Sequence, residues 1–247
     1  MTDFLYQYPP LKAGLLRKRY KRFLADVELE NGEVVTAHCP NTGPMTGVCQ
    51  VGQPVQLSVS NNPKRKHPYT WEMIQMEDPD PVWVGINTSV PNRVVKVGLE
   101  NGWFGELSGY DNVRSEVKYG ENSRVDFLLT GASQPPIYVE VKNTTWCQGD
   151  LALFPDTETK RGQKHLQELM ALLPEARVVM LYFINRSDCT QFTSGDQADS
   201  KYGELLRSAV DKGLEVLPCR FHVSPTGIRY LGLANYQFTL SQSMDGA

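Results

Sequence analysis

The first third of the chain alternates hydrophobic and polar residues in short runs, a pattern typical of β-strands. Residues Phe23–Leu29 alternate with a period of two, Glu30–Glu33 supply an Asn-Gly turn, and Val34–His38 would return as the second strand of a hairpin. Val51–Ser58 and Trp71–Met76 predict further short strands, separated by Pro and Gly. Several short strands in about 70 residues predict a small barrel, with an OB-like barrel as the candidate.

From residue 85 onward the pattern changes to mixed helix and strand. Pro91–Glu100 reads as a helix that ends at Asn101-Gly102, and residues 113–119 read as a strand. Arg124–Leu129 and Ile137–Lys142 then predict a hairpin around a turn rich in Gly and Pro.

The C-terminal part predicts two helices that alternate with buried strands. Asp156 is the expected N-cap of the first helix, and Gly162 in its apolar stripe suggests close contact with a sheet. The stripe comprises Gly162, Leu166, Leu169, Met170 and Leu173. Arg177–Ile184 predicts a strand buried on both faces.

A helix over Tyr202–Val210, stopped by Gly213, and a strand over Leu214–Val223 follow. Residues 185–200 look like a polar loop, and Ser241–Ala247 are expected to fray. Together these elements predict an α/β (α+β) chain. Its N-terminal OB-like barrel, residues 1–84, precedes a mixed-sheet domain, residues 85–247, with the boundary at Pro79-Asp80-Pro81.

Composition places the chain among globular proteins, because 40% of its 247 residues are hydrophobic and 21% are charged. The longest apolar run, Val178–Ile184, is too short to span a bilayer, and the N-terminus lacks an apolar signal region, so we expect no membrane association. Five scattered cysteines suggest free thiols in a reducing cytoplasm, and neither a disulfide framework nor a zinc site.

The net charge of −3 argues against a nucleic-acid ligand, but the cations are unevenly distributed. Two stretches of the first domain, Pro9–Ala25 and Val34–Trp71, contain cations and no acid, with aromatic residues among them. Cations neutralise phosphates and aromatic faces stack on bases, so this mixture suits nucleic acid. A solvated charged face is the alternative.

Two carboxylates and a lysine occupy matching positions of the predicted hairpin. Because Asp126 and Glu140 average to position 133, inside the turn, their Cβ atoms should lie about 5 Å apart if they share a face. Lys142 shares the face of Glu140. A divalent cation such as Mg²⁺ or Mn²⁺ would offset the repulsion between the carboxylates, and Lys142 would stabilise charge on a phosphate. The alternative is an Asp/Glu/Lys salt-bridge cluster on a solvated sheet face.

The start of the following helix is rich in cations, with Lys160, Arg161, Lys164 and His165. Arg161 and His165 are one turn apart and share a face, roughly opposite the centre of the apolar stripe. A phosphate backbone would suit such a face beside a carboxylate site. Ordinary solvation, with His165 as a surface histidine, is the alternative.

Over nearly its whole length the sequence resembles the sugar fermentation stimulation protein A (SfsA) family. The resemblance rests on blocks that occur in one order: His38–Gly43, Asn87-Thr88 with Pro91-Asn92, Glu106–Tyr110, Glu116–Gly120, Ser123–Phe127, Tyr138–Lys142, Phe154–Asp156 and Arg161–Leu166.

The resemblance implies an N-terminal OB-like domain and a C-terminal domain similar to the PD-(D/E)XK nucleases. It also implies DNA binding without strong sequence specificity and a regulatory role in maltose and sugar metabolism. Carried over by residue, the motif acids and metal ligands are Asp126 and Glu140, and the motif lysine is Lys142. The candidate nucleic-acid-binding residues are Arg17, Lys18, Arg19, Lys21, Arg22, Lys64, Arg65, Lys66, Arg124, Arg161, Lys164 and His165.

Two family features do not carry over directly. The nuclease superfamily often adds a glutamate from the first helix, and this chain has Val97-Gly98 where that residue is expected; Glu100 or Glu116 could substitute. A helix-turn-helix credited to the family near its C-terminus is rejected here, because Leu214–Pro218 reads as a strand.

Three functions therefore compete. The first is a DNA-binding protein with an intact metal-dependent nuclease site, and the second is a non-catalytic DNA-binding regulator with a vestigial site. The third, a sugar-metabolism enzyme, has no supporting motif, since the chain has no GxxxxGK[ST] phosphate loop. The oligomeric state is left open, with a homodimer as one option.

Overall fold

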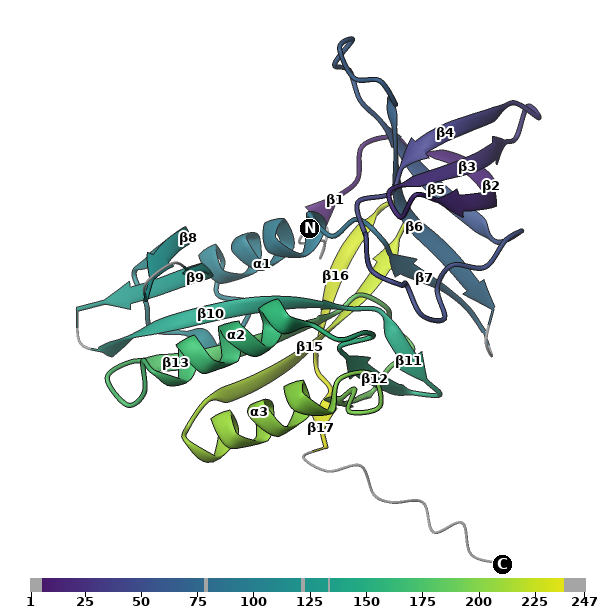
Figure 1. Ribbon diagram of the computed structural model, residues 1–247. Helices are drawn as coiled ribbons and strands as arrows, with labels where there is room; N and C mark the ends of the chain where they lie inside the picture. Colours follow the sequence, from purple (N-terminus) through teal and green to yellow (C-terminus); the bar gives the residue numbers. More distant parts are fainter. Residues whose placement is uncertain (1–5, 78–79, 121–122, 133, 238–247) are drawn as a thin grey trace, which may run out of the picture.

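The computed structural model describes residues 6–77, 80–120, 123–132 and 134–237. It has two parts, a β-barrel and a larger layered domain in which helices lie on both faces of a sheet (Figure 1). Two expectations, fraying of Ser241–Ala247 and the position of Pro79 in the boundary, fall outside the described residues. No helix in the described part of the chain is long and apolar enough to cross a membrane.

The N-terminal part is a six-stranded barrel with strand order β4-β3-β2-β5-β6-β7, closed by pairing of β4 with β6. The alternation of the sequence explains the core, because Ala25, Val27 and Val35 point inward and surround the fully buried Trp71. Gly32, with φ of 82°, makes the expected turn. The strands are β2 (Lys12–Tyr20), β3 (Leu24–Leu29), β4 (Val34–His38), β5 (Pro54–Val59), β6 (Tyr69–Glu77) and β7 (Pro81–Gly85).

The C-terminal domain is built on a seven-stranded mixed sheet of order β1-β16-β15-β13-β10-β9-β8. The central strand β13 runs parallel to β10 and β15, and the other neighbours are antiparallel. The strands are β1 (Tyr6–Gln7), β8 (Asn112–Tyr119), β9 (Ser123–Gly131), β10 (Gln134–Thr144), β13 (Arg177–Ile184), β15 (Glu215–Ser224) and β16 (Gly227–Leu233).

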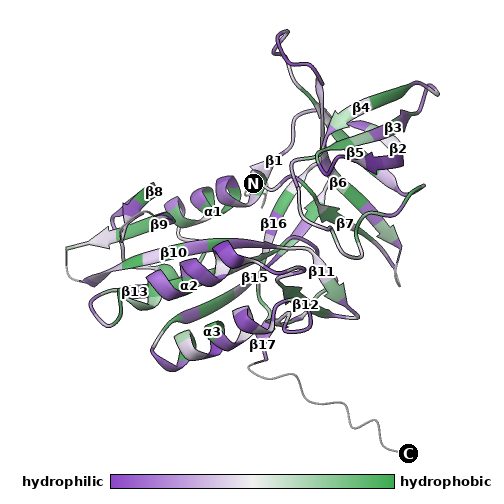
Figure 2. Ribbon diagram, in the orientation of Figure 1, coloured by the Kyte–Doolittle hydropathy of each residue, from purple (hydrophilic) through white to green (hydrophobic). Residues whose placement is uncertain are grey.

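Helices cover this sheet on both faces. The helix α1 (Val90–Glu100) buries Val94 and Val95 against one face, and α2 (Lys160–Met170) and α3 (Ser200–Asp211) cover the other (Figure 1). Hydrophilic and hydrophobic positions accordingly alternate along α2 and α3 (Figure 2). Since β13 lies between the two layers, every residue from Val178 to Ile184 is buried, as its apolar sequence predicts.

The start of α2 differs from the sequence-based expectation. Thr159, and not Asp156, caps the helix, because its side chain accepts a hydrogen bond from the N–H of Gly162. Asp156 instead accepts hydrogen bonds from the backbone of Met45 and Thr46 in the barrel part. Gly162 does make a close contact, but with Tyr202 of α3 and not with the sheet.

A second, small sheet was not predicted. It has the order β11-β12-β14-β17, and β14 lies within residues 185–200, which the sequence indicates as a loop. Its strands have only two to four residues each, too few to show a period. They are β11 (Trp146–Gln148), β12 (Leu151–Phe154), β14 (Gln191–Ser194) and β17 (Asn235–Tyr236). A short 3₁₀ helix, η1 (Gly105–Leu107), precedes β8.

The C-terminal helix–strand unit agrees with the sequence. The helix α3 ends before Gly213, whose φ of 105° turns the chain, and β15 follows. A helix-turn-helix in this region is therefore excluded, as the sequence predicts.

Candidate active site

The two acids of the hairpin come together through the register of β9 and β10. Tyr138 pairs with Leu128 and Val139 with Phe127. The next step of this antiparallel register sets Glu140 opposite Asp126, as the position of the turn predicts. Both acids line one pocket of about 230 Å³, together with Lys142 from β10.

Glu140 is 3% exposed and is held between two basic side chains. Its Oε1 atom accepts a hydrogen bond from Lys142 Nζ at 2.6 Å and lies 2.5 Å from His165 Nδ1. Burial opposes ionisation of Glu140, but the His165 hydrogen bond and the Lys142 charge outweigh it and hold the pKa below its usual value. Its Oε2 atom is also buried and has no hydrogen-bond partner among the residues that the structure describes.

Asp126 experiences a different environment. Its Oδ1 atom accepts a hydrogen bond from Asn92 Nδ2 at 2.7 Å, and its Oδ2 atom accepts one from the Val141 N–H at 2.7 Å. Burial and the nearby charge of Glu140 raise the pKa of Asp126 to about 6, since both donors are neutral and do not compensate fully. The pocket therefore contains Glu140, whose pKa is lowered, beside Asp126, whose pKa is raised.

Asn92 was not predicted as a site residue, although it belongs to a block that carries the family resemblance. It comes from the first turn of α1 and is the residue of this helix that reaches Asp126.

The positions considered for a third acid do not line the pocket. Glu100 forms an ion pair with Lys96 at 3.8 Å, and Val97 is 36% exposed. Glu116 is exposed on β8, with φ of 55°. The first helix thus contributes the amide of Asn92 to the pocket and no acid, and Val97 holds the position where a glutamate was expected.

His165 is the clearest correction among the candidate nucleic-acid-binding residues. It is 6% exposed and contacts Glu140, so it is neither a surface histidine nor opposite the buried side of α2. Arg161 also lines the pocket and donates from Nε to His165 Nε2 at 3.4 Å. Lys164 points elsewhere and pairs with Glu168 at 3.5 Å. Arg124 is exposed on β9 and donates to the carbonyl of Glu116.

The cations of the barrel divide into two groups. Arg19 donates to the carbonyls of Arg22, Asn41 and Gly43, and Arg22 donates to that of Thr42, so both hold the loop that follows β4. Arg17 pairs with Glu28 at 2.6 Å, and Arg65 donates to Thr70.

The exposed lysines form the second group and remain available at the surface: Lys18, Lys21, Lys64 and Lys66. Lys18 also lies over the ring of Tyr20, with Nζ 5.8 Å from the ring centroid.

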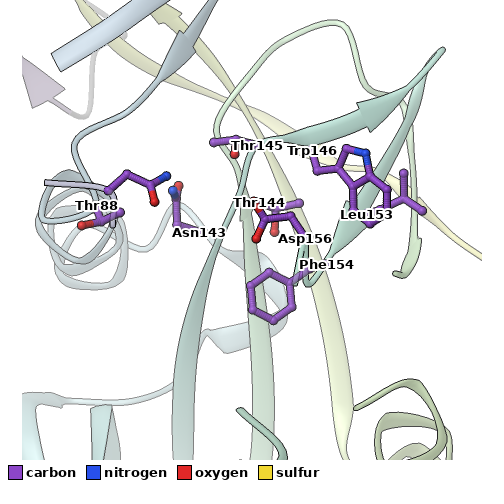
Figure 3. A pocket seen from close by; sticks show the side chains of 9 residues that line it. Thr88, Asn143, Thr144, Thr145, Trp146, Leu153, Phe154 and Asp156 are labelled. Carbon is purple, nitrogen blue, oxygen red and sulfur yellow. The ribbon is translucent and has the colours of Figure 1, made fainter. Parts of the chain in front are cut away.

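A second pocket adjoins the acidic one and shares Thr88 and Asn143 with it. It has a volume of about 240 Å³ and lies at the seam between the barrel and the layered domain. Thr88 and Asn143 stand on one side of it and Trp146 and Leu153 on the other (Figure 3). It is lined by Asn41, Thr88, Asn143, Thr144, Thr145, Trp146, Leu153, Phe154 and Asp156.

The acidic pocket fits a hard divalent cation. A half-buried carboxylate, Asp126, and a buried one, Glu140, line the same pocket. The buried Glu140 Oε2 atom has no partner among the described residues, which is costly without a bound group. A cation bound here would offset the burial and the Glu140 charge that raise the pKa of Asp126. Oxygen donors of this kind are those that Mg²⁺, Mn²⁺ and Ca²⁺ prefer. Asp126 and Glu140 are the residues that could hold the ion.

Comparison with known proteins gives a consistent result. A family model described as the sugar fermentation stimulation protein RE domain matches residues 89–227, and one described as the SfsA N-terminal OB domain matches residues 18–86. A sugar fermentation stimulation protein homolog of Picosynechococcus sp. is 65% identical over 239 residues, covering 96% of this chain and 95% of that protein. The homolog of Nostoc sp. is 66% identical over 237 residues, covering 95% and 98%.

Among solved structures, Pyrococcus furiosus SfsA in complex with Ca²⁺ superimposes with a TM-score of 0.85 at 24% identity, covering 95% of this chain and 99% of that one. The two proteins share the fold across both parts of the chain.

Proposed function

The chain belongs to the sugar fermentation stimulation protein family, and we propose that it is a DNA-binding protein whose nuclease-like domain cleaves phosphodiester bonds with a divalent metal. The observation that carries the proposal is that the half-buried Asp126 and the buried Glu140 line one pocket, with Lys142 in contact with Glu140. A salt-bridge cluster on a solvated face would not bury a carboxylate oxygen without a partner.

The carboxylate oxygens in the pocket identify the residues that would bind the metal ion. Asp126 and Glu140 would hold Mg²⁺ or Mn²⁺, which when bound would neutralise phosphate charge and activate water as a nucleophile. The related Pyrococcus furiosus protein was solved with Ca²⁺, which supports a divalent-cation site in this family.

The chain's own residues have separate tasks in this proposal. Lys142 brings a positive charge to the pocket, where it would stabilise charge on the phosphate. His165 and Asn92 fix the orientation of Glu140 and Asp126 through their hydrogen bonds. Arg161, at the pocket rim, would contact a neighbouring phosphate. The adjoining pocket, with Thr88 and Asn143 in common, offers space for a nucleotide next to that phosphate.

A non-catalytic DNA-binding regulator is the second candidate, and one observation favours it. The first helix, from which the nuclease superfamily often adds a glutamate, here supplies the amide of Asn92 and no acid to the pocket, so the site has fewer acidic ligands. On either reading, DNA binding with little sequence preference is the activity through which a role in sugar metabolism would be exercised.

The test is cleavage of single- and double-stranded DNA and RNA with Mg²⁺ or Mn²⁺. We expect metal-dependent cleavage that falls by at least about 100-fold in Lys142→Met and Asp126→Asn, while DNA affinity changes little. A matched control is Lys96→Met, which removes an exposed lysine of α1 outside the pocket. If the wild-type protein binds DNA but cuts none of these substrates, the regulator without nuclease activity is the correct function.

A further inference from the structure

Two cysteines that are 42 positions apart in the sequence meet beside the small sheet. The Sγ atoms of Cys147, in β11, and Cys189, just before β14, are 2.8 Å apart. This distance is shorter than the van der Waals contact of two sulfur atoms. A disulfide requires about 2.05 Å between the sulfurs, so bond formation would need only a small movement.

The two thiols are not equivalent. Cys189 is fully buried, whereas Cys147 is half-buried and lines a cavity of about 430 Å³ with Gly149, Arg186 and barrel residues such as Met76. The cavity gives a small molecule a route to Cys147 and not to Cys189.

The electrostatic environment separates the thiols further. The S–H of Cys189 donates to Cys147, and this hydrogen bond, together with the Arg186 charge, lowers the pKa of Cys147. The same contact and burial raise the pKa of Cys189. An accessible thiol with a lowered pKa next to a second thiol is typical of redox-active cysteines.

We propose that Cys147 and Cys189 form a reversible redox dithiol, with Cys147 as the attacking thiol and Cys189 as the resolving one. The oxidant is a low-molecular-weight disulfide. The Cys147 thiolate attacks one sulfur of that disulfide, and its other half leaves as a thiolate. Cys189, losing its proton to solvent, then attacks Cys147 Sγ and expels the second half. The protein dithiol loses two electrons, and the small disulfide is reduced to two thiols.

A metal site is the competing use of the same residues, because Asp188 also lies within reach of both sulfurs. However, both oxygens of Asp188 already bind the buried guanidinium of Arg186, at 2.7 and 2.5 Å. The carboxylate that a metal ion would need is therefore already occupied by the guanidinium, which leaves the two sulfurs to thiol chemistry. The redox pair is therefore the better assignment.

The experiment uses the full chain, oxidised glutathione as the probe, and mass spectrometry of peptides digested without reduction. We expect a Cys147–Cys189 disulfide to form first and to open with dithiothreitol, while Cys39, Cys49 and Cys219 stay reduced. In Cys189→Ser, glutathione should remain attached to Cys147, because nothing resolves the mixed disulfide. Cys147→Ser should take up no glutathione at Cys189, which is buried.

The control is Cys49→Ser, which removes the other half-buried cysteine and should leave the Cys147–Cys189 disulfide unchanged. Three results would each overturn the proposal: oxidation that joins other cysteines first, no stable adduct at Cys147 in Cys189→Ser, or about one zinc ion per chain that is lost in Cys147→Ser. All are independent of whether the protein cleaves nucleic acid.

Discussion

At the residue scale, burial acts on two carboxylates with opposite outcomes. Glu140 is the more deeply buried, yet Lys142 and His165 keep its pKa low. Asp126 receives hydrogen bonds only from the neutral groups Asn92 and Val141, and its pKa rises to about 6. The charge of the acidic pocket near neutral pH therefore depends on the ionisation of Asp126.

Metal affinity should fall as the pH drops through about 6, because Asp126 binds a cation only when ionised. Calorimetric titration with Ca²⁺ at pH 5.0 and pH 7.5 should show binding about tenfold weaker at the lower pH, where roughly one tenth of the Asp126 carboxyls are ionised. Equal affinity at both values would remove Asp126 from the ligand set.

Replacing Asp126 by Asn should stabilise the metal-free protein at pH 8. A carboxyl whose folded-state pKa is raised contributes stability below its unfolded value, near 3.8, and this contribution is lost as the pH rises through about 6. The amide removes that cost, so we expect a gain of about 1–2 kcal/mol at pH 8.

The measurement is urea unfolding with a chelator present. At pH 4.5 the variant and the wild type should differ little, and divalent cations should stabilise only the wild type. A variant less stable than the wild type at pH 8 would contradict this prediction.

The arithmetic of a hairpin predicts Asp126 opposite Glu140, because both strands and their turn are local in the sequence. Asn92 and His165 could not be predicted in this way, since they reach the acids from α1 and α2 through packing. His165 was expected on the solvent side of α2, but it lies beside the apolar stripe, and the stripe alone cannot show that this flank of the helix contacts Glu140.

At the scale of elements, the hydrogen bonds that cap the start of α2 also fix the part of the helix that lines the acidic pocket. The regular spacing of apolar residues made α2 predictable from the sequence. Its N-cap was not predictable, because Asp156 accepts hydrogen bonds from the backbone of the barrel part instead. Thr159 caps α2 and its own N–H donates to Asp199, the N-cap of α3. The two helix starts are therefore fastened together at the end of α2 that carries Arg161 and His165.

Thr159→Ala should lower the free energy of unfolding by about 1 kcal/mol, because the N–H of Gly162 loses its partner. Thr159→Ser retains the hydroxyl and should stay within about 0.5 kcal/mol of the wild type. Denaturant titration of both variants decides the matter, and equal losses in the two would show that the methyl group, not the cap, is what stabilises α2.

At the scale of the whole molecule, the structure is needed to tell which cations of the barrel are available to a ligand. The sequence groups arginines and lysines of the barrel together, but Arg19 and Arg22 are occupied in holding a loop. Reversing their charges would test that loop and not DNA binding. The exposed lysines are the appropriate probes.

DNA affinity should depend on salt, and two double variants should reduce that dependence: Lys18→Glu with Lys21→Glu, and Lys64→Glu with Lys66→Glu. Each phosphate that the variant no longer neutralises should lower the slope of log K against log salt by about 0.9. Fluorescence anisotropy from 50 to 200 mM salt, roughly the range over which such effects are large, measures the slope.

The control for these variants is Lys201→Glu with Lys212→Glu, two exposed lysines at the two ends of α3. Unchanged slopes in the barrel variants, or an equal change in the control, would exclude the barrel as the DNA-binding surface.

The pairing of β1 with β16 has a consequence for how the two parts move. The first described strand, β1, lies in the sheet of the layered domain, after which the chain passes through the barrel and returns to that domain at α1. The barrel is thus an insertion tethered at both ends, and a further hydrogen bond joins Gly85 to Asn185. A domain joined by a single linker can rotate freely, whereas free rotation of this barrel requires the pairing of β1 with β16 to break. If the barrel binds DNA as we propose, the bound strand would be kept at a nearly constant distance from Asp126 and Glu140, which would raise its effective concentration at the pocket.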